Sequence, residues 1–231
     1  MNWVKNALFV SVLSLASLGR ADVVFTDFGA GNTYNHPFAW ATNNNNIGFQ
    51  EVAMPFVPTA NAQLTNAIVA FGYGVQGSSA IFNVYGDSAG PGTLLASSSV
   101  ITPATPFNSQ GSDLTTVDFS SANVQLFAGT TYWLDADPTF GASTSTSWNE
   151  TTVTGGTFDY RQSAGGAWSS SGGPLGAFNI NGVVPEPGSV LLFAVSGLAL
   201  WITGARTRRN GRTAHGKPVA APASVGATTL D

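Results

Sequence analysis

The stretch Thr131-Tyr132-Trp133-Leu134-Asp135-Ala136 decides the fold class of this chain. Successive side chains of a β-strand point to opposite faces of the sheet. Tyr132, Leu134 and Ala136 therefore share one face, and Trp133 shares the other with Thr131 and Asp135. We expect the first face to pack into a core and the second face to be wet, as in a half-buried strand.

The same alternation recurs through residues 22–183, where Gly, Pro, Asn and Ser separate one repeat from the next. No helical period of useful length interrupts it. Many short strands without helices predict an all-β domain, an antiparallel β-sandwich that is jelly-roll-like, with a closed barrel as the alternative. The predicted strands are Val23–Phe28, Phe49–Phe56, Gln63–Val75, Ser79–Tyr85, Thr93–Ile101, Leu114–Phe119, Thr130–Ala136, Thr157–Arg161 and Ala177–Val183.

Charge is distributed unevenly along the chain. Between Asp22 and Pro187 there are eleven acidic residues and one basic residue, Arg161, which gives a net charge of −10, whereas the whole chain carries −4. Nucleic acids and anionic lipids are bound through clustered cations, so this composition argues against them as direct partners. No cysteine occurs, which excludes disulfides and thiolate metal sites.

A second distinctive stretch follows the β-rich region. Pro185-Glu186-Pro187 precedes an uncharged apolar run of seventeen residues, Ser189 to Ala205, and then come Arg206, Arg208 and Arg209. A membrane-spanning helix needs roughly 17 to 25 such residues, and flanking arginines are retained on the cytoplasmic side. The run is apolar on every side, which favours a C-terminal transmembrane helix over the alternative of a buried core helix.

Residues 184–209 resemble the PEP-CTERM sorting signal of exported bacterial proteins, in which the same three features occur in the same order. The resemblance implies export, transient anchoring in the inner membrane and processing by an exosortase. It assigns the recognised tripeptide to Pro185, Glu186 and Pro187, and the basic stop to Arg206, Arg208 and Arg209. The chain departs from the pattern because residues 210–231 follow the arginines; their composition predicts a disordered tail.

The first residues of the chain have the pattern of a secretory signal peptide. Lys5 precedes an apolar stretch from Ala7 to Leu18, and small residues follow it. The predicted signal peptide is 1–21, and the mature protein would begin near Asp22; a retained N-terminal anchor is the alternative. The exported β domain is then 22–183.

The exported domain resembles the "choice-of-anchor" group of exported bacterial domains over about residues 60–182. The resemblance rests on the stretches 81–92, 124–134 and 166–168. It implies a secreted sandwich without an assigned activity. Gly90-Pro91-Gly92 and Ala128-Gly129-Thr130 are also predicted to be turns between strands.

The sequence offers little for catalysis, and we expect a protein that is not an enzyme and that holds neither a cofactor nor a metal. His36, the one histidine before the tail, is predicted to be a solvated loop residue. Asp135 and Asp137 could pair as in a glycoside hydrolase, but they are predicted to be acids at a strand end. Calcium ligation by Asp87, Asp135 and Asp137 is a weaker alternative.

Aromatic side chains on a wet face of a sandwich could stack on sugars. The candidates are Trp133, Trp148, Trp168 and Tyr160. Residues 43–46, four consecutive asparagines, are predicted to form a solvated loop. The leading hypothesis is a non-catalytic cell-surface or extracellular-matrix protein among exopolysaccharide. The alternative is a carbohydrate-binding module that acts on exopolysaccharide.

Overall fold

The computed structural model describes residues 20–45, 48–109, 113–138, 144–152 and 156–185. All of them belong to one structural unit, Ser17–Pro185. Residues 1–19 of the predicted signal peptide, the transmembrane helix, the arginine cluster and the tail lie outside the described residues, whereas Arg20 and Ala21 begin β1. Within the described part, no helix combines the length and the apolar character that a membrane crossing requires.

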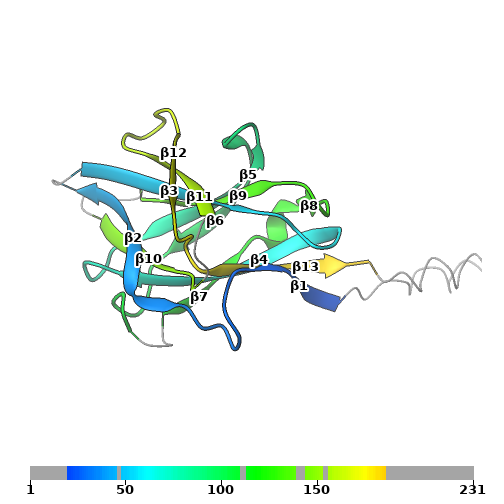
Figure 1. Cartoon of the computed structure of the whole chain (residues 1–231), viewed down its shortest axis with the longest axis horizontal. Coiled ribbons are helices and arrows are strands. Elements are labelled where there is room, and N and C mark those ends of the chain that lie inside the picture. Colours follow the sequence, from blue (N-terminus) through cyan, green and yellow to red (C-terminus); the bar gives the residue numbers. More distant parts are fainter. Residues whose placement is uncertain (1–19, 46–47, 110–112, 139–143, 153–155, 186–231) are drawn as a thin grey trace, which may run out of the picture. The chain divides into compact units, whose positions relative to one another are not determined.

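The described chain consists of β-strands (Figure 1). The only helical element among these residues is a 3-10 turn, Ser120–Ala122. The strands are β1 (Arg20–Thr26), β2 (Asn35–Asn45), β3 (Gly48–Phe56), β4 (Ala62–Tyr73), β5 (Ala80–Asp87), β6 (Pro91–Ile101), β7 (Leu114–Asp118), β8 (Gln125–Leu126), β9 (Tyr132–Asp137), β10 (Thr144–Glu150), β11 (Gly156–Arg161), β12 (Ser169–Gly173) and β13 (Phe178–Val184).

Each of the nine predicted strands is present with small shifts of its ends, so the all-β class is confirmed. Four strands were not predicted: β2, β8, β10 and β12. Strand β12 has the sequence Ser-Ser-Ser-Gly-Gly, which has no apolar side chain to alternate. It forms because β11 pairs with it along its whole length.

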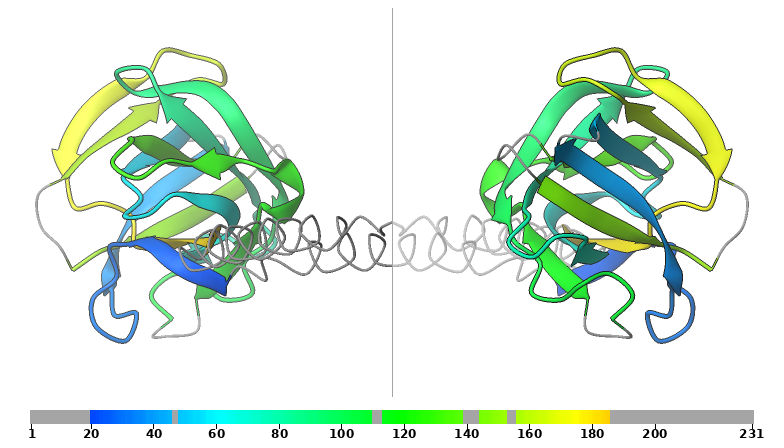
Figure 2. Two further views of the ribbon diagram at one scale, coloured as in Figure 1. Left: turned by 90° about the vertical axis from the view of Figure 1, so that its right-hand side faces the viewer. Right: turned by 90° about the vertical axis from the view of Figure 1, so that its left-hand side faces the viewer.

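The paired strands form an antiparallel network with a sandwich-like arrangement. Its order is β1-β13-β4-β10-β2-β3-β9-β5-β6, with β7 and β8 attached to β4, β11 attached to β3, and β12 attached to β11. One layer contains β1, β13, β4 and β7, and the other contains β3, β9, β5 and β6. Strands β10 and β2 connect them. The two views in Figure 2 show strands on both sides of the interior.

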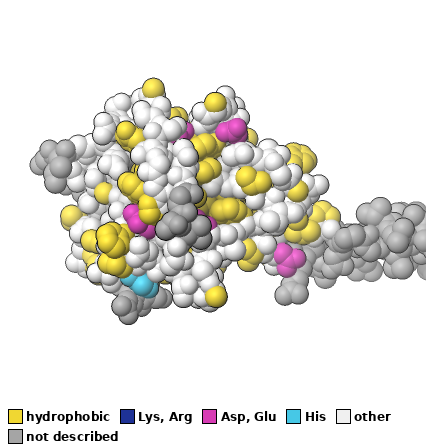
Figure 3. Space-filling model, viewed as in Figure 1, with side chains coloured by type: hydrophobic (Ala, Val, Ile, Leu, Met, Phe, Trp, Pro, Cys, Tyr) yellow, Lys and Arg dark blue, Asp and Glu magenta, His cyan; other side chains and the backbone are white. Residues whose placement is uncertain are grey.

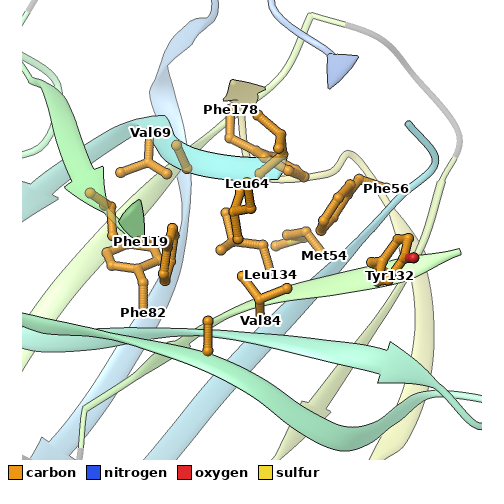
Figure 4. Packing of buried hydrophobic residues seen from close by; sticks show 14 of the residues in the cluster. Met54, Phe56, Leu64, Val69, Phe82, Val84, Phe119, Tyr132, Leu134 and Phe178 are labelled. Atoms are coloured by element: carbon orange, nitrogen blue, oxygen red, sulfur yellow. The ribbon is translucent and has the colours of Figure 1, made fainter. Parts of the chain in front are cut away.

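The core fills the space between these layers. Leu64 and Phe178 from the first layer meet Met54, Phe82 and Leu134 from the second, and all five are fully buried (Figure 4). Burying such side chains contributes about 1.5–3 kcal/mol each. The core thus explains why each of the strands that supply these residues has an apolar face.

The first and last strands are neighbours. Strand β1 pairs with β13, and Arg20 lies opposite Val184 (Figure 1). Signal-peptide cleavage near Asp22 would therefore remove the first residues of β1. Pro185, which begins the predicted sorting motif, follows β13 directly and is exposed.

Candidate ligand pocket

The outer face of the β3–β9–β5 layer is buried, although it carries charged side chains. Ala53, Asp135 and Asn83 lie opposite one another in the register of the three strands. Asp135 is 0% exposed and Trp133 is 7% exposed. The prediction of a wet face for Trp133 and Asp135 is therefore wrong. Side chains from neighbouring strands and turns cover this face.

A buried ion pair lies on this outer face. Arg161 of β11 is opposite Glu51 of β3. The Arg161 side chain donates two hydrogen bonds to the Glu51 carboxylate, from Nε at 2.7 Å and from Nη2 at 2.6 Å. The Trp168 ring centre lies 4.6 Å from the Arg161 guanidinium carbon. This paired geometry is the strong form of a carboxylate–guanidinium contact.

Asp135 shares the buried environment of Glu51. Burial, and then the charge of Glu51, raise the pKa of Asp135 well above its usual value. Asn83 Nδ2 donates to Asp135 Oδ2 at 3.0 Å, while Oδ1 receives no hydrogen bond from a described donor. A proton on Asp135 removes the repulsion between the two buried acids and leaves the Glu51 carboxylate to pair with Arg161.

Tyr85 completes this cluster. Burial, and then the negative charges of Asp135 and Glu51, raise the pKa of the Tyr85 hydroxyl. Its ring lies 6.5 Å from that of Trp168. Glu51 and Asp135 are both fully buried, so neither presents an oxygen to solvent.

An open pocket of about 320 Å³ lies beside this cluster. Strands β5, β9 and β11 and the β5–β6 turn supply most of its walls. Its lining residues are Pro55, Asp87, Ala89, Gly90, Trp133, Thr157, Asp159 and Ser170. Pockets that hold small molecules begin at about 300 Å³, so this one has room for a single small ring.

Two carboxyl groups shape the pocket. Asp87 Oδ1 accepts hydrogen bonds from Trp133 Nε1 at 2.9 Å and from the Gly90 amide at 3.3 Å. Asp159 Oδ1 accepts from the Ser170 hydroxyl at 2.6 Å. In each carboxyl group, Oδ1 is thus hydrogen-bonded to another residue of the pocket wall. Oδ2 of each group receives no hydrogen bond from the described residues. Asp159 is only 2% exposed, whereas Asp87 is exposed.

Gly90 allows the β5–β6 turn to approach Asp159. Its φ is 134°, a conformation that favours glycine. A Cβ at this position would lie 2.5 Å from Asp159 Oδ2. The glycine therefore lets the turn pack against Asp159 without a clash at this oxygen, and it explains why the turn, which the sequence predicted at Gly90-Pro91-Gly92, has this residue.

The four predicted sugar-binding aromatics have different positions. Trp133 lines the pocket, and Trp168 lies over Arg161 and beside Tyr85, which pairs with Trp133 across β5 and β9. Tyr160 is half-buried and packs near Phe158. The hypothesis is wrong for Trp148, because this side chain is fully buried in the core. Its ring packs against those of Phe82 and Phe178.

The weak proposal of a calcium site at Asp87, Asp135 and Asp137 is not supported. Asp135 is fully buried and accepts a hydrogen bond from Asn83, whereas Asp87 lines the pocket. Among the described residues, no three His, Cys, Asp or Glu side chains are grouped so that they could hold a metal ion.

A second group of buried polar side chains lies near the ends of β1, β2 and β10. Asn149 donates to Asp113 Oδ2, and the Phe178 amide donates to Asp27 Oδ1 at 2.7 Å. Burial raises the pKa of Asp27 to about 7 and also raises the pKa of Asp113. Several buried atoms here have no hydrogen-bond partner in the described structure: Asp27 Oδ2, Tyr34 OH, His36 Nδ1, Asp113 Oδ1 and Asn149 Oδ1.

His36 belongs to this group and corrects a prediction. It lies in β2 rather than in a loop, it is half-buried, and its ring centre is 4.2 Å from that of Tyr34. The predicted asparagine loop is also partly wrong. Asn43, Asn44 and Asn45 end strand β2 and pair with the start of β3. The neighbouring strands β10 and β3 supply the hydrogen bonds that the polar sequence alone does not indicate.

The sequence analysis missed Glu51, Asp159, Arg161 and Ser170. One signal was available, because Arg161 is the single Lys or Arg in the domain 22–183, which contains ten acidic residues. Its partner Glu51 is 110 positions away in the chain, so no local spacing connects the two residues.

Comparison of the chain with protein-family models, with curated proteins and with solved structures finds no match. The function therefore has to be argued from the residues and their geometry.

Proposed function

We propose that this chain is an exported, non-catalytic cell-surface or extracellular-matrix protein that is sorted by a PEP-CTERM signal and processed by an exosortase. The C-terminal helix, Ser189–Ala205, would anchor it in the inner membrane before processing. The observation that carries the proposal is the order of Pro-Glu-Pro, apolar run and arginines. Strand β13 ends at Val184, which supports a motif that begins where the folded domain ends.

The exported domain is proposed to be a jelly-roll-like sandwich. The strand order supports this, because β1-β13-β4-β7 and β3-β9-β5-β6 are two sets of four strands, and successive members along the chain change set at every step except β5 to β6. Jelly rolls consist of two four-stranded layers. Strands β2, β8, β10, β11 and β12 are additions to this framework.

The burial of the acidic pair supports a non-catalytic role for the domain. A general acid or base must be within hydrogen-bond reach of a substrate. Glu51 and Asp135 are covered, and the side chains around them satisfy Asp135 Oδ2 and both Glu51 oxygens. Turnover of a polysaccharide that is abolished by Asp135→Asn would contradict this proposal.

The sorting signal is tested by replacing Glu186. We expect Glu186→Ala to leave the chain at full length in the membrane, because a recognised acidic side chain is lost from the motif. The matched control is Asp118→Ala, which removes an exposed acid on β7. Immunoblots of membrane, surface and medium fractions measure the outcome. Normal release of Glu186→Ala would refute motif-directed processing.

Carbohydrate binding is the second candidate function, and the pocket at Trp133 favours it. An indole beside carboxyl and hydroxyl groups offers an apolar surface together with hydrogen-bond acceptors, as sugars require. We expect Trp133→Ala to abolish retention on the polysaccharide from the producing cells. The control is Phe127→Ala, which removes an exposed ring outside the pocket and should not change this retention. Unchanged retention of a folded Trp133→Ala variant would eliminate this function for the pocket.

A further inference from the structure

We infer that the Trp133 pocket binds a protonated amino sugar, such as a glucosamine unit of a polysaccharide. The inference rests on the carbohydrate-binding function proposed above and specifies the ligand of the same pocket. It depends on the two carboxyl oxygens, on the lack of a free cation nearby, and on the indole that lines the wall.

The two carboxyl groups offer acceptors that the protein does not use. Asp87 and Asp159 each commit Oδ1 to the wall of the pocket, through Trp133 and Ser170 respectively. Oδ2 of each is left for a ligand. Asp159 is almost fully buried, and a buried carboxylate with an unused oxygen gains most from a charged donor. An ammonium group has three donors and no acceptor, so it complements unused carboxyl oxygens.

No cation competes for these carboxyl groups. Of the described side chains, Arg161 is the only Lys or Arg, and Glu51 already holds it through two hydrogen bonds. The face in Figure 3 likewise shows acidic side chains and no Lys or Arg. Uronic acids, phosphates and sulfates would be repelled here. A net charge of −10 between Asp22 and Pro187 would raise the local concentration of cationic ligands.

The remaining walls suit a sugar ring rather than a bare cation. The hydrogen bond from Trp133 Nε1 to Asp87 fixes the indole, while Pro55 and Ala89 add apolar surface. A sugar ring can place its C–H groups against such a surface, and an ammonium gains from a nearby indole. A calcium ion, by contrast, takes six to eight oxygen ligands. The pocket has two carboxyl groups and two hydroxyls.

The test compares three ligands that differ at one position of the sugar. The full chain, purified in detergent, is titrated calorimetrically with β-1,4-linked tetramers of glucosamine, N-acetylglucosamine and glucose at a pH where the amine is protonated. We expect the glucosamine tetramer to bind about tenfold more tightly than the other two, as one charge-assisted hydrogen bond would provide. Added salt should reduce this difference.

Variants assign the effect to the pocket. Asp87→Asn and Asp159→Asn preserve the shape of the side chain but remove its charge. With either variant, the glucosamine tetramer should bind about as tightly as the other two tetramers. Asp118→Asn, on β7 of the other layer, should leave the glucosamine preference unchanged. Gly90→Ala, which crowds Asp159 Oδ2, should weaken binding of all three tetramers.

Each other result overturns the inference in a recognisable way. Equal affinity for the three tetramers would refute the amine preference but retain sugar binding. Calcium that displaces the glucosamine tetramer and binds in its absence would make the site a metal site. No binding of any tetramer, with polysaccharide retention intact, would place the sugar site elsewhere. The sorting function is tested separately, by the distribution of the Glu186→Ala variant among membrane, surface and medium fractions.

Discussion

The two groups of buried acids in this domain are stabilised differently. On the outer face of β3 and β9, burial raises the pKa of Glu51 and of Asp135, and Glu51 is paired with Arg161. Near β10, Asp113 is buried and Asp27 is half-buried; no described Lys or Arg pairs with either, and an amide donor reaches one oxygen of each. A buried carboxyl is stabilised by a paired cation or by a proton. The first group has a cation, whereas in the second group burial raises the pKa of both acids and no described cation offsets it.

The largest effect should come from removing the cation of the first group. Arg161→Met leaves the Glu51 charge buried without its partner, and such changes cost about 3–5 kcal/mol. Chemical denaturation of the purified chain measures the loss. Adding Glu51→Gln to Arg161→Met should recover part of it, because the orphaned charge is gone. Equal stability of the single and double variants would show that the ion pair is not what matters here.

The next effect is spread over several pH units and should appear as pH dependence in the second group. The pKa of Asp27 is about 7 in the folded protein against 3.8 in an unfolded chain, so the folded state binds the extra proton between these values. Stability from Asp27 is therefore complete below about pH 4 and is lost as pH rises through 7, by up to about 1.4 kcal/mol per unit. Asp27→Asn keeps an oxygen for the Phe178 amide and should flatten this slope.

Denaturation midpoints measured from pH 4 to pH 8 give the slope. Asp118→Asn is the control, because that carboxyl is exposed. An Asp27→Asn chain with the same slope as the original would assign the pH dependence to other groups.

The smallest effect is expected for Asp135→Asn. The amide has the shape of a protonated carboxyl, so it can donate to Glu51 and accept from Asn83. The loss of stability should stay below about 1 kcal/mol, the typical net value of one hydrogen bond. A loss as large as that of Arg161→Met would mean that Asp135 carries a charge in the folded protein.

The sequence predicted the strands that have an apolar face and missed those that do not. Strands β4 and β9 have alternating apolar side chains, whereas β10 reads Thr-Ser-Thr-Ser-Trp-Asn-Glu and takes its place from its pairing with β2 and β4. The alternation of side chains along a strand also predicted that Trp133 and Asp135 lie on the same face, which is correct. It could not foresee that the β5–β6 turn and Trp168 would cover that face.

The candidate pocket was only partly predictable for the same reason. Trp133 stood out as an aromatic residue on the non-core face, and Gly90 as a turn residue. Asp159 and Ser170 become neighbours through the β11–β12 pairing, and Asp87 reaches Trp133 across 46 positions of sequence. Contacts between residues so far apart in the sequence are determined by the fold and cannot be recognised from the local spacing of residues.

The position of β13 also has a mechanical consequence. This strand is hydrogen-bonded along one side to β1 and along the other to β4, and its last residue is Val184. A tether that continues from Val184 would pull the strand lengthwise. Both rows of hydrogen bonds would then bear the force together in shear, rather than opening one after another, so the domain would resist being drawn apart from that end.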